Sequence, residues 1–204
     1  NSAFEYGGKE NLAISREISR DWFNNYAANK GMTADVISKK HNIPFKNLWQ
    51  YDFPDEIQHN PNIKAIFCST FFSWDSNEHL RIAKSYGFKE LDNPGEGTYR
   101  KFVGIDELIN RLHQYMKVLK FGYGRATDHA SEDIRLKEIS REKAKELVKK
   151  YDLQPLGKKY LSQISDFLEY SESELHTILE KYRNEDIWEK KDNGEWFITN
   201  HLED

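Results

Sequence analysis

The chain has 204 residues, with 34 acidic and 30 basic side chains and a net charge of −4 at pH 7. This length suits one sizeable domain or a domain with an appendage, and the negative charge argues against a nucleic-acid-binding protein. One cysteine, no signal peptide and no apolar run near the roughly 20 residues that cross a bilayer exclude a disulfide-rich secreted protein and a membrane span, so we expect a cytoplasmic protein.

The first part of the chain mixes helical and irregular patterns. Hydrophobic side chains at helical spacing predict a helix over residues 10–30, which Gly31 ends. Thr33 is a favourable N-cap for a short helix through Lys40. Residues 44–61 are irregular, and their alternating aromatic side chains are typical of an edge strand or an extended packing arm.

The strongest strand pattern of the sequence is the apolar run of residues 63–72. A helix capped by Asp75 or Ser76 follows it and ends at Gly87. A strand, a short turn and a helix in this order are typical of a doubly wound α/β fold with a parallel sheet. One strand is too few for such a sheet, so we expect the chain to be a fragment whose missing strands lie upstream.

The second half is predicted to be mostly helical. The expected helices are residues 105–120, 128–136, 140–151 with Ser140 as the cap, 158–170, and one from Ser171 or Ser173 to near Arg183. An Asp-Asn-Gly-Glu turn at residues 192–195, between Trp188 and Trp196, predicts a terminal β-hairpin. We therefore divide the chain into residues 1–121, the last part of an α/β domain, and residues 122–204, a helical region with a terminal hairpin.

The densest group of polar side chains follows two glycines, Gly122 and Gly124. Glycine adopts backbone angles that are closed to other residues and lets a ligand approach the main chain. The residues that follow, 125–135, are typical of a helix N-terminus, where free N–H groups attract anions. We therefore expect Arg125 to bind a phosphate or a carboxylate there with its planar guanidinium.

Two interpretations of the neighbouring Asp128 and His129 are open. In the first, Asp128 raises the basicity of His129, and both belong to a catalytic site. In the second, Thr127 or Asp128 is the N-cap of the helix, and His129 is a surface residue in its first turn.

Trp74 and Asp75 directly follow the predicted strand, at the end of a sheet where ligands bind in open α/β folds. Trp74 offers a flat face to a sugar ring, and Asp75 accepts hydrogen bonds from hydroxyl groups. Equally open is a structural interpretation, in which Asp75 caps the next helix and Trp74 packs on it. The histidines show no metal-ligand spacing with carboxylates or cysteines, so we predict no metal site.

Residues 125–135, with Ser140, Arg141 and Glu142 after them, resemble the signature of the N-acetyl sugar amidotransferases. Members of this family are PP-loop enzymes of the ATP-pyrophosphatase type, with an adenine nucleotide alpha hydrolase-like sheet, in lipopolysaccharide and nonulosonic (pseudaminic or legionaminic) acid biosynthesis. The resemblance touches nearly the whole chain, without the PP-loop that binds ATP.

The segment from Asn1 to Gly8 is similar to a second stretch of that family. This similarity implies that Glu5, Tyr6, Gly7 and Gly8 lie near the mouth of the substrate pocket. The alternative is a loop in which the two glycines only turn the chain.

The resemblance implies an enzyme that converts the N-acetyl group of an amino sugar to an acetamidino group. The carbonyl oxygen attacks the α-phosphate of ATP and pyrophosphate leaves; ammonia then attacks the adenylated imidate, and AMP departs. The missing N-terminal segment would hold most of the ATP and Mg²⁺. Ammonia would come from partner proteins, a glutaminase and a cyclase-like protein.

The clustering of polar residues in this chain leads us to predict roles for several of them. Arg125 would clamp an anionic group of the sugar or nucleotide, and His129, oriented by Asp128, would take a proton from the attacking ammonium. The sugar pocket would be shaped by Glu5, Tyr6, Trp74 and Asp75.

Two other classes of function compete with this one. A tRNA-modifying PP-loop ATPase would be expected to show a basic stripe and often paired cysteines, and the sequence shows neither. A non-catalytic module that docks the ammonia-supplying partner would need no ATP loop.

Overall fold

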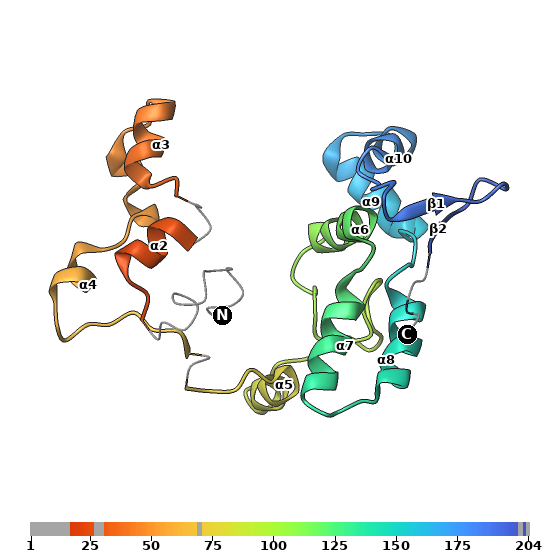
Figure 1. Cartoon of the computed structure of the whole chain (residues 1–204), viewed down its shortest axis with the longest axis horizontal. Coiled ribbons are helices and arrows are strands. Elements are labelled where there is room, and N and C mark those ends of the chain that lie inside the picture. Colours follow the sequence, from red (N-terminus) through yellow and green to blue (C-terminus); the bar gives the residue numbers. More distant parts are fainter. Residues whose placement is uncertain (1–16, 27–30, 69–70, 200–201, 203–204) are drawn as a thin grey trace. The chain divides into compact units, whose positions relative to one another are not determined.

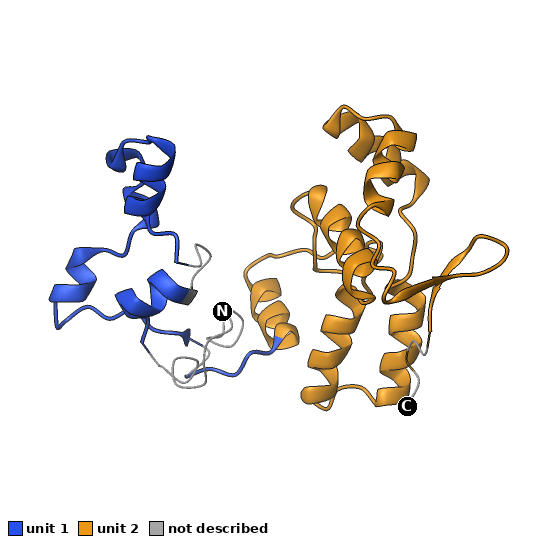
Figure 2. Ribbon diagram, turned by 45° about the horizontal axis from the view of Figure 1, so that its top comes forward, with its two compact units in different colours: residues 1–75 blue, residues 76–204 orange. Residues whose placement is uncertain are grey.

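The computed structural model describes residues 17–26, 31–68, 71–199 and 202. The chain divides into two compact units, unit 1 (Asn1–Asp75) and unit 2 (Ser76–Asp204) (Figure 2). Each unit has its own hydrophobic core, and the two are described separately.

Unit 1 is built from short helices around a small aromatic core. Its elements are α2 (Arg20–Tyr26), α3 (Ala34–His41), the 3-10 turns η1 (Phe45–Asn47) and η2 (Trp49–Tyr51), and α4 (Asp55–His59) (Figure 1). In the core, Trp22 meets the ring of Phe67 edge to face, with centroids 4.8 Å apart. Thr33 caps α3 by accepting a hydrogen bond from the backbone N–H of Val36, which confirms the predicted cap.

The strand predicted at residues 63–72 is wrong over the described residues of that segment. They make a single antiparallel bridge, between Glu17 and Ile66, with the Ile18 N–H 2.8 Å from the carbonyl of Ala65. A strand depends on a hydrogen-bonded neighbour along its length, and the described part of unit 1 supplies a neighbour at one residue only. Ile66 therefore remains 42% exposed.

The described residues of unit 2 form six helices and a hairpin. Its helices are α5 (Ser76–Ser85), α6 (Ile109–Phe121), α7 (Arg125–Arg135), α8 (Arg141–Tyr151), α9 (Lys158–Leu168) and α10 (Glu172–Glu180). Helices α7 and α8 run side by side as an antiparallel pair (Figure 1). Helices α9 and α10 pack against each other and against α6. The main core consists of Leu112, Leu119, Tyr160, Ile164, Leu175 and Leu179.

Local sequence signals set several helix ends in unit 2. Ser140 caps α8 as predicted, and Ser171 forms a capping box with Glu174 at the start of α10. Helix α6 begins at Ile109, later than predicted. At its start the Tyr160 hydroxyl accepts a hydrogen bond from the Leu112 N–H at 2.8 Å and donates to the Leu108 carbonyl at 2.7 Å. Tyr160, which is distant in the sequence, thus forms hydrogen bonds with backbone groups at the start of α6. The N–H groups of a first helical turn have no partner within the helix.

The predicted hairpin is confirmed. Among the described residues, its two strands make up the β-sheet. Strand β1 (Trp188–Lys190) pairs antiparallel with β2 (Trp196–Ile198), with Trp188 opposite Ile198. The indole N–H of Trp188 donates to the carbonyl of Leu119 at 3.0 Å, so the hairpin is fixed to the last turn of α6. None of the described helices is long and apolar enough to span a membrane.

The core of unit 2 predicts the effect of shortening one side chain. Ile164 is fully buried, so Ile164→Ala should lower the free energy of unfolding by about 3 kcal/mol through lost burial and a residual cavity. The matched control is Phe167→Ala on the same helix, which removes a side chain that is 66% exposed and should change stability by less than about 0.5 kcal/mol. Chemical denaturation followed by circular dichroism measures both, and equal losses would show that the core is assigned wrongly.

Candidate functional site

The two glycines of the predicted site allow side chains of the same chain to approach the backbone closely. Gly122 ends α6 with φ of +75°, and a Cβ atom there would lie 2.8 Å from Cγ2 of Ile187. A Cβ atom at Gly124 would lie 2.7 Å from Cγ2 of Val118 and 2.8 Å from Oδ1 of Asp152. Internal packing is therefore a sufficient reason for glycine at both positions, and their role in ligand approach stays a prediction.

The N-terminus of α7 holds an anion, and that anion belongs to the chain. Asp152, which is 1% exposed at the end of α8, accepts hydrogen bonds from the N–H groups of Gly124 and Ala126, both at 2.8 Å, and from that of Thr127 at 3.3 Å. The hydroxyl of Thr127 also donates to this carboxylate. The expected affinity of the helix start for anions is thus real, but Asp152 already occupies the N–H groups that a ligand would use.

Asp128 and His129 do not form the predicted pair. The carboxylate of Asp128 binds the ammonium of Lys117 on α6, with contacts of 2.6 and 2.8 Å. The ring nitrogen Nδ1 of His129 lies 3.1 Å from the hydroxyl of Thr98. Adjacent residues of a helix point about 100° apart, so each side chain finds its partner on a different element.

His129 is buried and neutral rather than a surface residue or a strong base. It is 5% exposed, and its ring packs edge-on against Tyr99 with centroids 5.8 Å apart. Burial lowers the pKa of His129 to about 3, and the positive charges of Arg100 and Arg125 act in the same direction. The prediction that a neighbouring carboxylate raises its basicity is therefore wrong.

A buried ion-pair network supports His129 and was missed from the sequence. Arg100, in the loop before α6, is 6% exposed and binds the carboxylates of Glu132, at 2.9 Å, and Asp133. Asp133 also accepts a hydrogen bond from the hydroxyl of Tyr99. Arg100 lies more than thirty residues from Glu132 and Asp133, so no local sequence pattern predicts that they pair. The one signal in the sequence is a pair of adjacent acidic residues on the buried side of a helix.

Ser76 extends this network to the start of α5. Its backbone N–H and hydroxyl both donate to Oε1 of Glu132, at 3.1 and 2.7 Å. Burial works against ionisation of Glu132, but these hydrogen bonds and the charge of Arg100 outweigh it and lower the pKa of the carboxyl. The network therefore connects α5 and the loop before α6 to α7.

Arg125 has a side-chain hydrogen-bond donor that no described residue satisfies. It is half-buried at the first position of α7, and its Nε is buried without a hydrogen-bond partner among the described residues. Lys117, on the preceding helix, is paired with Asp128, and its ammonium lies 4.5 Å from the centre of the Tyr123 ring. We define the Arg125 corner as Lys117, Tyr123, Arg125 and Asp128, at the junction of α6 and α7.

The other predicted site residues are not brought to this corner by any described contact. Glu5, Tyr6, Gly7 and Gly8 lie outside the described residues. Trp74 and Asp75 belong to unit 1, where the side chain of Trp74 is 54% exposed. Within the described residues, no group of three or more His, Cys, Asp or Glu side chains is arranged to hold a metal ion.

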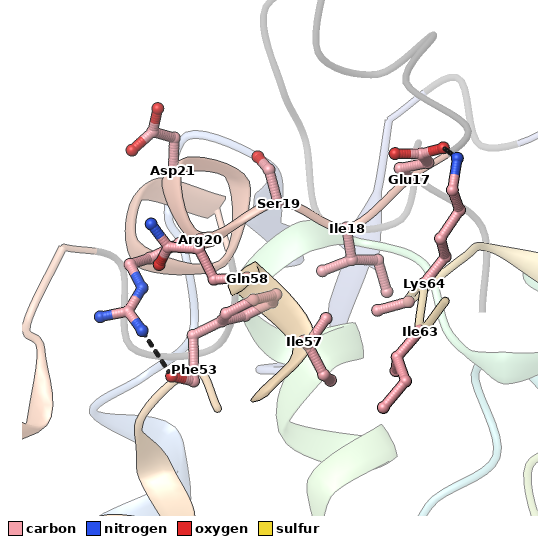
Figure 3. A pocket seen from close by; sticks show the side chains of 11 residues that line it. Glu17, Ile18, Ser19, Arg20, Asp21, Phe53, Ile57, Gln58, Ile63 and Lys64 are labelled. Carbon is pink, nitrogen blue, oxygen red and sulfur yellow. Dashed lines mark hydrogen bonds and ion pairs between the residues drawn. The ribbon is translucent and has the colours of Figure 1, made fainter. Parts of the chain in front are cut away.

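A pocket of about 290 Å³ lies within unit 1 (Figure 3). Phe53 and Ile57 form part of its apolar floor. At its rim, Arg20 donates to the carbonyl of Phe53 at 3.0 Å, and Lys64 pairs with Glu17 at 2.8 Å. These charged side chains are engaged by unit 1 itself, and we assign the pocket no ligand.

The comparison with protein families assigns the region that contains the Arg125 corner. Residues 96–203 match the family model described as LPS biosynthesis protein WbpG-like, C-terminal domain. The chain belongs to this WbpG-like family. The matched range includes Arg100, helices α6–α10 and the hairpin, so the Arg125 corner and the buried network, except Ser76, are parts of the WbpG-like domain. The family is one of lipopolysaccharide biosynthesis, and a comparison with curated proteins finds no match.

The Asp152 carboxylate should be the most sensitive single group of the WbpG-like domain. Asp152→Asn replaces one accepting oxygen by an amide and removes the charge, so we expect a loss of about 3 kcal/mol in the free energy of unfolding. Asp166→Asn, at an exposed position of α9, makes the same chemical change and should be nearly neutral. Urea unfolding compares the two; a nearly neutral Asp152→Asn would mean that the carboxylate does not hold α7.

The burial of His129 predicts how stability depends on pH. The unfolded chain protonates this ring near its ordinary pKa of 6.5, whereas the folded protein does so only near pH 3. Below pH 6.5 the unfolded state thus binds a proton that the folded state excludes, and stability falls. Between pH 7 and pH 5 we expect this residue to remove about 2 kcal/mol. His129→Gln should flatten the dependence, while His176→Gln, at an exposed site, should keep it; an unchanged slope in His129→Gln would exclude the effect.

Proposed function

We propose that this chain is part of an ATP-dependent N-acetyl sugar amidotransferase of surface polysaccharide or nonulosonic acid biosynthesis. The enzyme would convert the N-acetyl group of an amino sugar to an acetamidino group. The main support is that the WbpG-like match, at residues 96–203, covers the same residues that resemble the amidotransferase signature. Membership in a lipopolysaccharide biosynthesis family favours a saccharide substrate over the tRNA substrate of the competing hypothesis.

In this proposal, Arg125 binds an anionic group of the sugar or its nucleotide. One observation supports the role: Nε of Arg125 is buried without a hydrogen-bond partner among the described residues. A planar guanidinium suits a phosphate or a carboxylate. Asp128 holds Lys117 in place at 2.6 Å, so its role is to position a cation rather than to orient His129.

His129 is not carried forward as the catalytic base. A ring with a pKa of about 3 is a weak proton acceptor at neutral pH, and burial separates it from solvent. Its contact with Thr98 instead fixes the loop before α6 against α7. We propose that His129 has a structural role as a neutral residue, in which it helps to hold α7, and with it Arg125, in position.

The described residues do not fit ATP phosphates or Mg²⁺. The N–H groups at the start of α7 are filled by Asp152, and the described residues contain no cluster of carboxylates for a cation. We therefore propose that a segment outside the described residues binds both, and we derive no catalytic step through them from this chain.

Unit 1 has the surface expected of a partial α/β domain. Ile63, Phe71, Phe72 and Trp74 are all more than two-fifths exposed, although large apolar side chains normally gather in a core. We propose that further polypeptide covers them and completes a doubly wound sheet. Trp74 and Asp75, with Glu5, Tyr6, Gly7 and Gly8, remain our proposal for the sugar pocket, and a glutaminase with a cyclase-like protein remains our proposal for the ammonia supply.

The proposal is tested by amidine formation in the enzyme that carries the ATP-binding segment. With ATP, Mg²⁺, ammonia and an N-acetyl amino sugar, mass spectrometry should show exchange of the acetamido oxygen for NH. Arg125→Gln should lower kcat/KM by about 10- to 100-fold through loss of a charged hydrogen bond. Arg135→Gln, an exposed position on the same helix, is the matched control and should leave kcat/KM unchanged. Equal activity of both variants would remove Arg125 from the site, and no amidine from any N-acetyl sugar would overturn the function.

A further inference from the structure

A wide cleft lies between α10 and the terminal hairpin, and no residue of the Arg125 corner lines it. It has a volume of about 750 Å³. Trp196 of β2 and Pro155 of the loop before α9 provide apolar surface, and Glu180 lines the cleft from the last position of α10. Pockets for small-molecule ligands have volumes of about 300–1,000 Å³, so the cleft is large enough for a ligand of this kind.

Arg183 connects the two walls of this cleft. Its side chain is 8% exposed and donates two hydrogen bonds to the carboxylate of Glu180, at 2.6 and 2.8 Å. The same guanidinium lies 4.5 Å from the centre of the Trp188 ring and 5.1 Å from that of Trp196. The indole N–H of Trp188 is in turn bound to the end of α6. Glu180 and Trp196 are thus held in place without a ligand, which lowers the entropy that binding costs.

Polar groups of both signs of charge line the cleft beside Trp196. Glu180 and Glu195 supply carboxylates, while His176 and Lys190 supply an imidazole and an ammonium. The ammonium of Lys190 lies 5.3 Å from the centre of the Trp196 ring, and among the described residues it has no ion-pair partner. Its hydrogen-bond donors are therefore available to a ligand.

The polar groups of α10 and the hairpin lie close enough to act on one another. Hydrogen bonding by Arg183 lowers the pKa of Glu180, and burial opposes this change. The positive charges of Arg183, His176 and Lys190 act in the same direction as the hydrogen bonds. A hydrogen-bond acceptor and two donors are therefore neighbours in one cleft.

This mixture of groups favours an uncharged ligand with several hydroxyl groups. Each hydroxyl both donates and accepts a hydrogen bond, so it can use a carboxylate and an ammonium at the same time. An anionic ligand would meet the two glutamates, and a cationic ligand would meet Lys190 and Arg183. The C–H groups of a sugar ring form an apolar face that packs against an aromatic side chain. A neutral sugar ring thus fits the lining better than a sugar phosphate does.

We propose that the cleft between α10 and the hairpin binds a neutral sugar ring, packed on the indole of Trp196 with its hydroxyl groups between Glu180 and Lys190. The proposal does not depend on the amidotransferase reaction. It rests on the lining of the cleft and on membership in a family of lipopolysaccharide biosynthesis, whose products contain sugars. All the residues that carry it lie within the matched range, 96–203.

The test is a titration of the ¹⁵N-labelled 204-residue chain with the methyl glycosides of glucose, galactose, mannose and N-acetylglucosamine. We expect at least one of these neutral sugars to shift the indole N–H resonance of Trp196 saturably. The alditol of the bound sugar keeps the hydroxyl groups but has no ring, so it should bind at least about tenfold more weakly. No saturable shift of the Trp196 resonance by any of the four sugars, or equal binding of the alditol, would overturn the proposal.

A pair of tryptophan variants tests the aromatic surface, with Kd measured from the resonances of the sugar by saturation transfer. Trp196→Ala should raise the Kd at least about tenfold, because the apolar face of the ring loses its contact. Trp49→Ala removes a tryptophan of unit 1 that is 69% exposed, and it should leave the Kd unchanged. Identical Kd values for the two variants would show that the sugar does not contact Trp196.

A charge variant gives a result that simple loss of the hairpin would not give. The uronic acid glycoside of the bound sugar should bind about tenfold more weakly than the neutral sugar, because the two glutamates repel it. Glu195→Gln keeps an accepting oxygen and removes one charge, so it should strengthen binding of the uronate about threefold and change that of the neutral sugar by less than about twofold. An unchanged ratio of the two Kd values would contradict the assigned lining. Since neither ATP nor a partner takes part, sugar binding at the cleft and amidine formation can each fail without the other.

Discussion

The carboxylate of Asp152 at the start of α7 is the interaction on which the WbpG-like domain depends. It satisfies three backbone N–H groups and a hydroxyl in a place that water does not reach. A helix start buried without such a partner would carry several unsatisfied donors, each at a cost of about 1–3 kcal/mol. One side chain at the end of α8 therefore satisfies the start of α7 and connects the two helices.

A second set of buried charges holds the other side of α7. Arg100 neutralises Glu132 and Asp133, and these side chains also take hydrogen bonds from Ser76 and Tyr99. Breaking one member of a buried, hydrogen-bonded network leaves its partner charged and unpaired, which is far more costly than losing an ion pair on the surface. Helix α7 is thus fixed on two sides by buried charged groups.

The sequence predicts features of this protein that depend on neighbouring residues. Thr33, Ser140 and Ser171 cap the helices expected of them, and the Asn-Gly turn gives the terminal hairpin, because caps and turns are decided within about four residues. Helix α7 begins earlier than predicted because its cap, Asp152, comes from a different helix. The pairing of Asp128 with Lys117, the burial of His129 against Thr98 and the failure of residues 63–68 to form a strand all depend on contacts that lie eleven or more residues away.

The attachment of the hairpin to α6 affects the order in which parts of the domain can fold during translation. The last carbonyls of α6 are satisfied by the Trp188 indole and by the backbone N–H of Asn184, which lies 3.0 Å from the carbonyl of Leu119. A nascent chain that has released α6 and α7 from the ribosome, but not yet residues 184–188, therefore lacks these two partners of the Leu119 carbonyl. Domains acquire their final packing as units once enough of the polypeptide has emerged. The C-terminal end of α6 accordingly completes its hydrogen bonds only after a segment more than sixty residues further along the chain has been synthesised.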